Sequence, residues 1–281
     1  MEPKTFVLIG AAGYIAPKHF NAIQKIGGKL IAVIDPVDNL DILDDYFPNA
    51  EYFRSIEDAK PFMKTNLVDY FVVCSPTHLH FDHISFGLKN NCDVICESPL
   101  VLTWNELEKL KDIESQSAHK IYNLLQYRHD PAFIELKKNF DNKKHYLITL
   151  KNFSYRGKWL AHSWKGDSKK TGGLITALGY HFFDGFINIY GKPIETKLEK
   201  NTNQHCLGNM KLENATVDFE LANSFKQEEN RNELFIEVDE QIIDLYKSDK
   251  ELFIRAYQHI TNNKGIGISD IEPTIKFLEK R

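Results

Sequence analysis

His181 has the chemistry of a general base. It follows a glycine pair, Gly172-Gly173, and lies in an apolar stretch, Gly173–Ile189, whose pattern predicts a helix. Helical spacing would place Ala177, His181 and Asp184 on one face. An imidazole titrates near neutral pH, which suits it to take a proton from a hydroxyl group while hydride leaves the same carbon. The alternative is a buried histidine that donates to a backbone carbonyl.

Positive charge gathers in the loop before this helix. Lys165, Lys169 and Lys170 lie close together in the sequence, and Arg156 precedes them. Ammonium and guanidinium groups pair well with phosphates and carboxylates, so an anionic ligand is one interpretation. A solvated basic loop that holds no ligand is the other.

The start of the chain has the pattern of a dinucleotide-binding turn. The apolar run Phe6–Ile9 leads into Gly10-Ala11-Ala12-Gly13 and then into a predicted helix. The first glycine permits a tight turn, the second lets the backbone approach a pyrophosphate, and the helix N-terminus offers free N–H groups. Asp35, after the run Leu30–Ile34, would accept hydrogen bonds from ribose hydroxyls and repel a 2′-phosphate, which favours NAD over NADP. The alternative is a tight turn without a ligand.

Two later strand ends carry polar residues that suit the same ligand. Ser75-Pro76-Thr77 follows the apolar run Tyr70–Cys74, and Glu97 follows Asp93–Cys96. Cofactors bind at the carboxyl ends of parallel strands, so the first segment would lie against the dinucleotide. Glu97 would meet the nicotinamide ribose, and Pro99 would stiffen the turn, where a cis peptide bond is an option. An ordinary strand, turn and helix is the alternative for each segment.

The segment His78-x-His80-x-Asp82-His83 allows a second interpretation. Its spacing is that of the dinuclear zinc motif of metallo-β-lactamase-type hydrolases, since neutral imidazoles and a carboxylate suit zinc. Those hydrolases do not begin with a phosphate-turn unit, and the glycine pair that follows their last histidine is missing after His83. We therefore predict no metal site and keep a zinc hydrolase only as an alternative.

The elements that must position these residues fall into two groups. The first ~120 residues alternate strand and helix patterns, and their near-continuous apolar strands indicate a parallel sheet covered on both faces. The predicted strands are Thr5–Ile9, Leu30–Ile34, Tyr70–Cys74, Asp93–Cys96 and Lys120–Leu124. The predicted helices are Ile15–Ile26, Ile56–Lys64, Leu79–Lys89 and Thr103–Gln116.

Longer alternating strands follow, and they predict an open, mainly antiparallel sheet. These strands are His145–Ser154, Glu195–Asn203, Met210–Leu221, Asn232–Val238 and Gln241–Tyr246. The accompanying helices are Pro131–Phe140, Gly173–Ile189, Asp249–Thr261 and Ser269–Glu279. We therefore expect an α/β Rossmann-type domain over residues 1–121 and an α+β domain over residues 122–281, with a ligand cleft between them.

The composition is that of a soluble globular protein. The chain has 281 residues, of which 42 % are hydrophobic and 26 % charged, and its net charge is −4. This charge favours no nucleic-acid partner, and no apolar run reaches the ~18 to 20 residues of a membrane span. The four cysteines have no metal or redox spacing, so we expect a reducing, cytoplasmic setting.

In this order, the motifs resemble the Gfo/Idh/MocA oxidoreductase family. The marks are the Gly10–Gly13 turn, Ser75-Pro76-Thr77, the Glu97-x-Pro99 turn and the helix from Gly172-Gly173 to His181. More closely, the chain resembles UDP-N-acetylglucosaminuronate 3-dehydrogenases of surface-polysaccharide (O-antigen) biosynthesis. The segments that carry this likeness are Ile9–Pro17, Tyr122-Asn123-x-Leu125-Gln126-x-Arg128-His129, Arg156-Gly157, Ser163-Trp164-Lys165-Gly166-Asp167 and Gly179-x-His181-Phe182-x-Asp184.

The resemblance implies an NAD enzyme that oxidises the 3″-hydroxyl of a UDP-linked acetamido uronic acid. It implies that 2-oxoglutarate can re-oxidise the cofactor, and that the second domain's open sheet forms a homodimer or homotetramer. The implied cofactor contacts are Gly10, Ala12, Gly13, Tyr14, Ile15, Asp35, Ser75, Pro76, Thr77, His80, Glu97, Ser98, Gln126 and Trp164. The implied substrate contacts are Arg128, Arg156, Lys165, Asp167, Thr176 and His181, and the implied catalytic positions are His181, Ser98 and Ala177.

The sequence departs from the family at two of these positions. The family's turn is Glu-Lys-Pro, and its lysine helps to handle the substrate hydroxyl proton, but this chain has Ser98. The family has Asp or Asn four residues before the histidine, but this chain has Ala177. A lone serine hydroxyl has too high a pKa for a general base, and alanine has no polar group.

Losing such groups commonly slows a reaction by orders of magnitude while binding survives. Two hypotheses therefore stay open. The chain is a sugar-nucleotide 3-dehydrogenase, active or disabled, or it is a non-catalytic protein that binds NAD or a sugar nucleotide.

Overall fold

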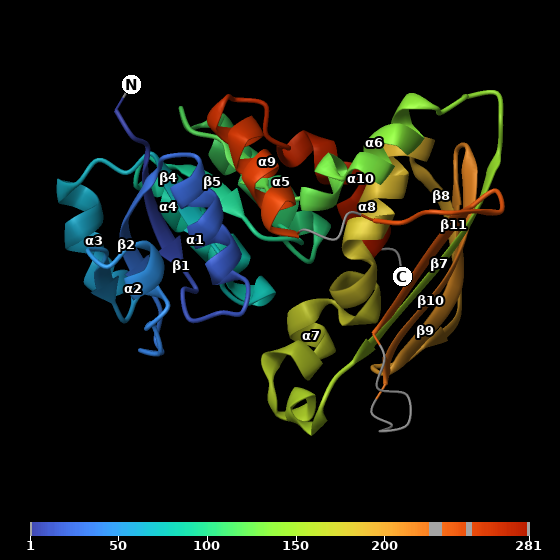
Figure 1. Cartoon of the computed structure of the whole chain (residues 1–281), viewed down its shortest axis with the longest axis horizontal. Coiled ribbons are helices and arrows are strands. Elements are labelled where there is room, and N and C mark those ends of the chain that lie inside the picture. Colours follow the sequence, from blue (N-terminus) through green and yellow to red (C-terminus); the bar gives the residue numbers. More distant parts are fainter. Residues whose placement is uncertain (1, 225–231, 246–248, 280–281) are drawn as a thin grey trace. The chain divides into compact units, whose positions relative to one another are not determined.

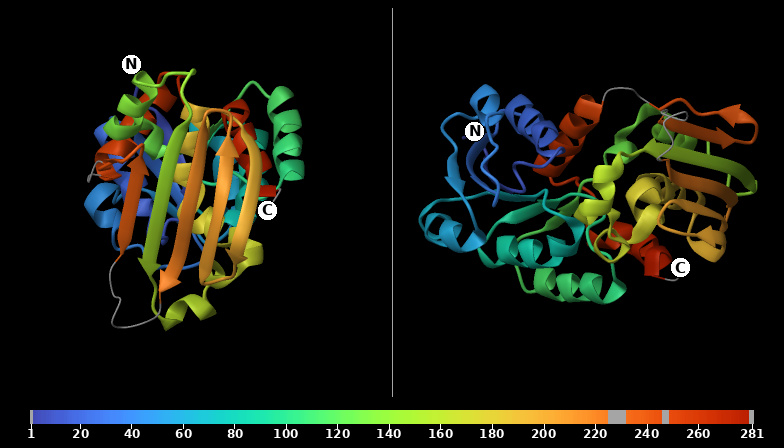
Figure 2. Two further views of the ribbon diagram at one scale, coloured as in Figure 1. Left: turned by 90° about the vertical axis from the view of Figure 1, so that its right-hand side faces the viewer. Right: turned by 90° about the horizontal axis from the view of Figure 1, so that it is seen from below.

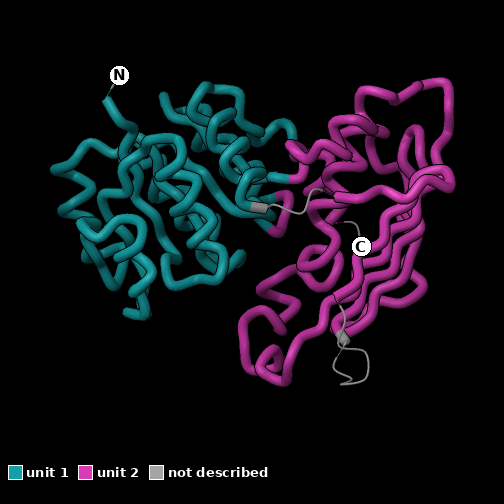
Figure 3. The backbone as a smooth tube through the Cα atoms, viewed as in Figure 1, with its two compact units in different colours: residues 1–101, 105–126, 248–270 teal, residues 102–104, 127–247, 271–281 magenta. Residues whose placement is uncertain are grey.

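The computed structural model describes residues 2–224, 232–245 and 249–279. Their contacts divide the chain into two compact units, coloured separately in Figure 3. The first unit holds residues 1–101, 105–126 and 248–270, and the second holds residues 102–104, 127–247 and 271–281. The division at 126/127 lies a few residues beyond the predicted boundary at 121/122. Helix α9 (Asp249–Thr261) belongs to the first unit, which the order of elements along the chain could not reveal.

The first unit is built on a parallel sheet of six strands in the order β3-β2-β1-β4-β5-β6 (Figure 1). Its strands are β1 (Thr5–Ile9), β2 (Lys29–Ile34), β3 (Glu51–Phe53), β4 (Tyr70–Val73), β5 (Asp93–Cys96) and β6 (Ile121–Asn123). The edge strand β3 was not predicted, because a three-residue strand is too short to show a period. The central strands are buried on both sides, as the continuous apolar runs predicted. The predicted doubly covered parallel sheet is confirmed.

Helices cover both faces of this sheet. They are α1 (Ala16–Lys25), α2 (Leu43–Tyr46), α3 (Ile56–Thr65), α4 (His80–Lys89), α5 (Trp104–Ser115) and α9. Helices α1 and α9 pack together on one face, and α4 covers β4 and β5 on the other (Figure 2). The core between β1, α1 and α9 contains Phe6, Phe20, Ile23, Phe253 and Tyr257. This packing holds α1 against β1 and α9.

The second unit contains a mixed sheet in the order β12-β11-β7-β10-β9-β8. Its strands are β7 (Tyr146–Tyr155), β8 (Pro193–Asn201), β9 (His205–Leu212), β10 (Ala215–Ser224), β11 (Glu233–Val238) and β12 (Gln241–Ile242). All neighbouring pairs are antiparallel except β7 and β10, which run parallel. Among the described residues, one face of this sheet carries no helix (Figure 2). The predicted open, mainly antiparallel sheet is confirmed.

Two strand predictions for this sheet are corrected. The single strand predicted over Met210–Leu221 is a hairpin, because a turn at Glu213-Asn214 separates β9 from β10. Buried residues alternate on both sides of the turn, which hides it in the pattern. The strand predicted over Gln241–Tyr246 is shorter, and Tyr246 lies outside the described residues.

The helix predicted over Gly173–Ile189 is also corrected. It begins as a π-helical turn, η5 (Ile175–Gly179), and continues as the regular helix α8 (Tyr180–Tyr190). Phe183 holds α8 against the sheet, with its ring 5.0 Å from that of Phe219 and 5.1 Å from that of Phe277. The remaining helices are α6 (Pro131–Lys138), α7 (Ser168–Thr171), α10 (Ile268–Glu279) and the short η1 (Thr77–Leu79), η2 (Gln126–His129), η3 (Lys158–His162) and η4 (Trp164–Gly166).

Within the part of the chain that the structure describes, no helix is both long and apolar enough to cross a bilayer. The four cysteines are buried free thiols.

Candidate functional site

The glycine turn after β1 has the form of an anion-binding loop. Gly10 has a φ of +93°, and a Cβ there would lie 2.6 Å from the carbonyl carbon and oxygen of Cys74. Only glycine fits such a position without moving backbone atoms. The turn closes with hydrogen bonds from Gly10 N–H to the Ile34 carbonyl (2.8 Å) and from Gly13 N–H to the Gly10 carbonyl (3.1 Å). Helix α1 starts at Ala16, so its first N–H groups follow this turn.

Asp35 is fixed at the end of β2, beside the same turn. Its Oδ2 accepts the Ala12 N–H at 2.9 Å, and its Oδ1 accepts the Val37 N–H at 2.9 Å. The residue is 6 % exposed. Each carboxylate oxygen keeps a second lone pair, so the group can still accept bonds from ribose hydroxyls. The other predicted contacts of this turn differ in exposure, since Tyr14 is 82 % exposed and Ile15 is half-buried.

The loop after β4 is braced by two histidines. Burial lowers the pKa of His83 to about 4, so its ring is neutral at pH 7, and its Nδ1 lies 2.8 Å from Ser75 Oγ. His80 is buried with Nε2 2.9 Å from the Ser75 carbonyl and Nδ1 2.9 Å from the Pro99 carbonyl. Burial also lowers the pKa of His80. A neutral imidazole has one N–H, so His80 donates to one of the two loops at a time.

Several nitrogens in the zinc-like spacing face protein groups. Among the described residues, no group of three or more His, Cys, Asp or Glu side chains could hold a metal ion. The ring nitrogens of His80 face carbonyls, and His83 Nδ1 faces Ser75 Oγ. The segment from His78 to His83 covers the end of η1 and the first residues of α4, and His80 and His83 contact the loop after β4.

The turn after β5 is tied to the end of β6. Ser98 Oγ donates to the Leu124 carbonyl at 2.6 Å, and Ser98 N–H donates to Glu97 Oε2 at 3.1 Å. Asn123 Nδ2 donates to the Cys96 carbonyl at 3.1 Å. The peptide bond between Ser98 and Pro99 is cis. The hydroxyl proton at position 98 is therefore engaged with the backbone.

Gln126, at the end of the first unit, carries a buried acceptor. It is 7 % exposed, and its Oε1 has no hydrogen-bond partner among residues 2–224, 232–245 and 249–279. Buried polar atoms are nearly always paired, so this oxygen fits a ligand that donates, such as the carboxamide of nicotinamide. Together with the glycine turn and Asp35, it shows that the residues present fit a dinucleotide such as NAD.

In the second unit, Arg128 is held by a buried carboxylate. Its Nε donates to Asp184 Oδ2 at 2.7 Å and its second terminal nitrogen to Oδ1 at 2.8 Å. Thr274 Oγ1 adds a third bond to Oδ1 at 3.0 Å. Asp184 is fully buried and the Arg128 side chain is 11 % exposed. The predicted substrate contact at Arg128 is thus a side chain whose orientation is set by Asp184.

The π-turn changes the surroundings of the predicted catalytic helix. Ala177 is exposed and lies in the π-turn, whereas the half-buried His181 and the fully buried Asp184 lie in α8, so the three residues do not belong to one regular α-helix. A π-turn has more residues per turn than an α-helix, so it rotates the residues before it. Thr176 Oγ1 donates to the Gly172 carbonyl at 3.0 Å. The ring of Tyr127 meets that of His181 edge-on at 5.4 Å.

The basic loop brings two cations together. The charge of Arg156 and burial both lower the pKa of Lys165, with burial the larger cause. Lys165 Nζ lies 5.8 Å from the centre of the Trp164 ring. Asp167 is not part of this pair, because its Oδ1 accepts the Lys169 N–H at 2.9 Å and caps α7. Two like charges held close together are stabilised by a bound anion.

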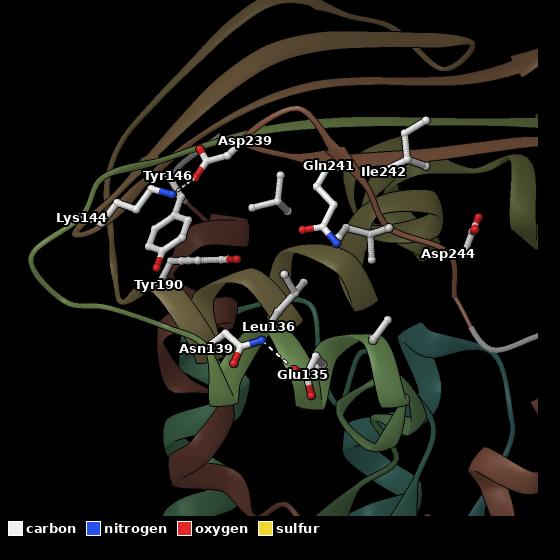
Figure 4. A pocket seen from close by; sticks show the side chains of 13 residues that line it. Glu135, Leu136, Asn139, Lys144, Tyr146, Tyr190, Asp239, Gln241, Ile242 and Asp244 are labelled. Carbon is white, nitrogen blue, oxygen red and sulfur yellow. Dashed lines mark hydrogen bonds and ion pairs between the residues drawn. The ribbon is translucent and has the colours of Figure 1, made fainter.

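A separate groove of about 440 Å³ lies between α6 and the β11–β12 hairpin (Figure 4). An ion pair between Lys144 Nζ and Asp239 Oδ2, at 2.6 Å, forms one side of it. None of the predicted cofactor, substrate or catalytic residues lines this groove, so the groove is not part of the predicted site. The other lining residues are Ala132, Glu135, Leu136, Asn139, Tyr146, Tyr190, Val238, Gln241, Ile242, Ile243 and Asp244.

Three residues of these sites were not indicated by any motif. Thr274 bonds to Asp184, and His19 and Tyr257 form a buried chain with Glu97. One signal could have found His19, since it lies on the apolar face of α1 with Ala16, Phe20 and Ile23. Tyr257 and Thr274 lie in ordinary amphipathic helices and carry no such signal.

Comparison with known proteins gives two family matches. The Gfo/Idh/MocA profile described as "Oxidoreductase family, NAD-binding Rossmann fold" matches residues 4–124. The companion profile, "Oxidoreductase family, C-terminal alpha/beta domain", matches residues 145–243.

Solved structures resemble the chain over nearly its whole length. The WlbA (WbpB) dehydrogenase from Thermus thermophilus, in complex with NAD and alpha-ketoglutarate, is 31 % identical with a TM-score of 0.91, covering 97 % of this chain and 92 % of that one. The same dehydrogenase in complex with NAD and UDP-GlcNAcA is 30 % identical with a TM-score of 0.91, covering 98 % and 93 %.

Curated relatives match over a shorter range. Glucose-6-phosphate 3-dehydrogenase from Bacillus subtilis (strain 168) is 27 % identical over 195 residues, which is 64 % of this chain and 52 % of the relative. The chain spans about half the length of the curated relatives it matches.

Proposed function

This chain belongs to the Gfo/Idh/MocA oxidoreductase family, whose first domain binds NAD, and we propose that its substrate is a UDP-linked acetamido uronic acid of UDP-GlcNAcA type, oxidised at the 3″-hydroxyl. One observation carries the choice of substrate. The structure resembles the Thermus thermophilus WlbA complex with NAD and UDP-GlcNAcA over 98 % of this chain. We place the reaction in surface-polysaccharide biosynthesis.

The second unit supports an anionic substrate. Arg156 and Lys165 are close enough for the guanidinium charge to lower the pKa of the lysine. A diphosphate or a sugar carboxylate would neutralise them and form charge-assisted hydrogen bonds.

His181 is our candidate for the proton acceptor. NAD, when bound, supplies the acceptor for the hydride. The substrate hydroxyl must lose a proton in the same step, and an imidazole suits that transfer at neutral pH. Ser98 is engaged with the Leu124 carbonyl, and Ala177 has no polar atom, so neither assists His181. We therefore propose that the chain binds both ligands and turns them over slowly.

A non-catalytic binding protein is the second candidate. The observation that favours it is that Ser98 and Ala177 stand where the family resemblance implies Lys and Asp or Asn, while the glycine turn, Asp35 and the basic loop persist. Both candidates require NAD and sugar-nucleotide binding. They differ only in whether NADH is produced.

Two further features belong to the proposal. We propose that 2-oxoglutarate re-oxidises the cofactor, because the WlbA complex was crystallised with alpha-ketoglutarate. We also propose a homodimer or homotetramer that pairs the helix-free face of the second unit's sheet. Light scattering and NADH consumption with 2-oxoglutarate test these features separately.

Calorimetry on the NAD-loaded protein tests the substrate class. We expect UDP-GlcNAcA to bind more tightly than UDP-GlcNAc or UDP alone. Lys165→Ala should weaken UDP-GlcNAcA binding by about tenfold, the effect of one lost charge-assisted contact. Lys158→Ala is the matched control, because Lys158 is an exposed lysine of η3 in the same loop region. Failure of every UDP-sugar to bind the NAD-loaded protein would refute the proposed substrate.

A further inference from the structure

Three side chains from distant parts of the first unit form a buried chain. His19 lies on α1, Glu97 follows β5 and Tyr257 lies on α9. His19 Nδ1 is 2.6 Å from the Tyr257 hydroxyl, and His19 Nε2 is 2.8 Å from Glu97 Oε1. His19 and Tyr257 are fully buried, and the Glu97 side chain is 13 % exposed.

The positions of the protons in this chain follow from its donors and acceptors. Burial raises the pKa of Tyr257 well above its usual value, so the phenol keeps its proton. Within the described residues, the Tyr257 hydroxyl has no acceptor other than His19 Nδ1. The phenol must therefore donate to Nδ1, which leaves the ring proton on Nε2, where it donates to Glu97. The reverse tautomer would leave a buried phenol proton without an acceptor.

The surrounding titratable groups fit this assignment. Cys74 at the end of β4 and Cys96 in β5 are buried thiols whose pKa values are raised by burial, so both are neutral. His80 on α4 has its pKa lowered by burial. Lys18 on α1 lies farther out, with its Nζ 5.6 Å from the Phe253 ring, and that ring meets His19 edge-on. Tyr257 thus donates to His19, and His19 donates to the Glu97 carboxylate.

Glu97 occupies the far end of the edge where the dinucleotide binds. The sheet order places Asp35 after β2, the glycine turn after β1, Ser75 after β4 and Glu97 after β5. Asp35 suits the adenosine ribose, and the glycine turn suits the pyrophosphate. The ends of β4 and β5 would therefore lie beside the nicotinamide half of a bound dinucleotide. Its second oxygen, Oε2, accepts the Ser98 N–H, so both oxygens are oriented.

We propose that Tyr257 and His19 are positioning residues that hold the Glu97 carboxylate for the nicotinamide ribose, so that helix α9 strengthens NAD binding without contacting NAD. The proposal rests on the NAD-binding fold and not on the sugar-nucleotide substrate. If UDP-sugars fail to bind, the proposal is unaffected.

Tyr257→Phe in the full chain tests it, because the ring stays and only the hydroxyl is removed. We expect NAD and ADP-ribose, which carry the second ribose, to bind about fivefold more weakly, as for one lost hydrogen bond. ADP, which lacks that ribose, should bind unchanged. The ¹⁵N shifts of His19 should report a single Nε2–H tautomer in the parent chain and a mixture in the variant.

Two further variants make the result decisive. Tyr70→Phe is the matched control, because Tyr70 is a buried tyrosine whose ring stacks on Phe6 at 5.0 Å, in the same core as Tyr257. It should leave NAD affinity unchanged. In a Glu97→Gln background, Tyr257→Phe should have little further effect on NAD affinity, because the coupled carboxylate is gone. Equal weakening of NAD and ADP, an unchanged NAD affinity, or an unchanged His19 tautomer in Tyr257→Phe would overturn the proposal.

Discussion

The hydroxyl of Ser98 donates a 2.6 Å hydrogen bond to the carbonyl of Leu124, 26 residues later in the chain. This bond ties the turn after β5 to the segment after β6. The family resemblance implies a lysine at this position, but the Ser98 hydroxyl is engaged with the backbone. We therefore expect Ser98 to contribute to stability and not to proton transfer.

Removing the Ser98 hydroxyl should therefore affect stability. We expect Ser98→Ala to lower the free energy of unfolding by about 1 kcal/mol, since the Leu124 carbonyl loses its donor. Urea denaturation measures this. Ser115→Ala is the control, because that hydroxyl makes a 2.7 Å bond to the Asp112 carbonyl on an exposed helix, where water can replace it. A larger loss in the control than in Ser98→Ala would contradict the structural role.

The buried ion pair of Arg128 and Asp184 predicts a large effect. Asp184→Ala removes the buried carboxylate that accepts two hydrogen bonds from the guanidinium, and it should destabilise the protein by about 3–5 kcal/mol. Thr274→Val removes only one of the three bonds to Asp184 and should cost about 1 kcal/mol. Thermal or denaturant unfolding compares the two variants. If both variants lowered the free energy of unfolding by a similar small amount, the ion pair of Arg128 and Asp184 would not be a major source of stability.

Asp35 should set the choice between NAD and NADP. Asp35→Ser removes the negative charge that repels a 2′-phosphate, so we expect the ratio of NAD to NADP affinity to fall by at least about tenfold. NAD itself should bind more weakly, because the ribose loses an acceptor. Titrations with both cofactors measure the ratio. An unchanged ratio would show that discrimination lies elsewhere.

His83 predicts a pH-dependent stability. Its pKa is about 4 in the folded protein against 6.5 for an exposed histidine, so between these values the unfolded chain binds the extra proton. Stability from this group is complete above about pH 6.5 and is lost as the pH falls towards 4. The loss is about 3 kcal/mol at most. His83→Gln should flatten the dependence, and equal slopes for variant and parent would disprove the assignment.

Local patterns in the sequence were enough to predict much of the fold. Strand β1 and helix α9 begin and end where the apolar pattern predicted, and the glycine turn and Asp35 lie at the strand ends where they were expected. These features depend on residues close together in the chain. Periodicity and turn chemistry record such features directly.

Contacts across the chain could not be predicted in this way. Arg128 and Asp184 are 56 residues apart, and His19 and Tyr257 are 238 residues apart. A pattern can mark a residue as buried but cannot say which buried residue it meets. The π-turn at Ile175–Gly179 was missed for a related reason, because its apolar sequence reads as an ordinary helix.

The central claim is that the ligands are held while the proton-handling groups at positions 98 and 177 are missing. NADH absorbance during incubation of the NAD-loaded protein with UDP-GlcNAcA tests it most directly. We expect the parent chain to form NADH slowly and Ser98→Lys combined with Ala177→Asn to form it faster by orders of magnitude, with little change in ligand affinity. Rapid turnover by the parent chain, or no gain in the double variant, would contradict the account.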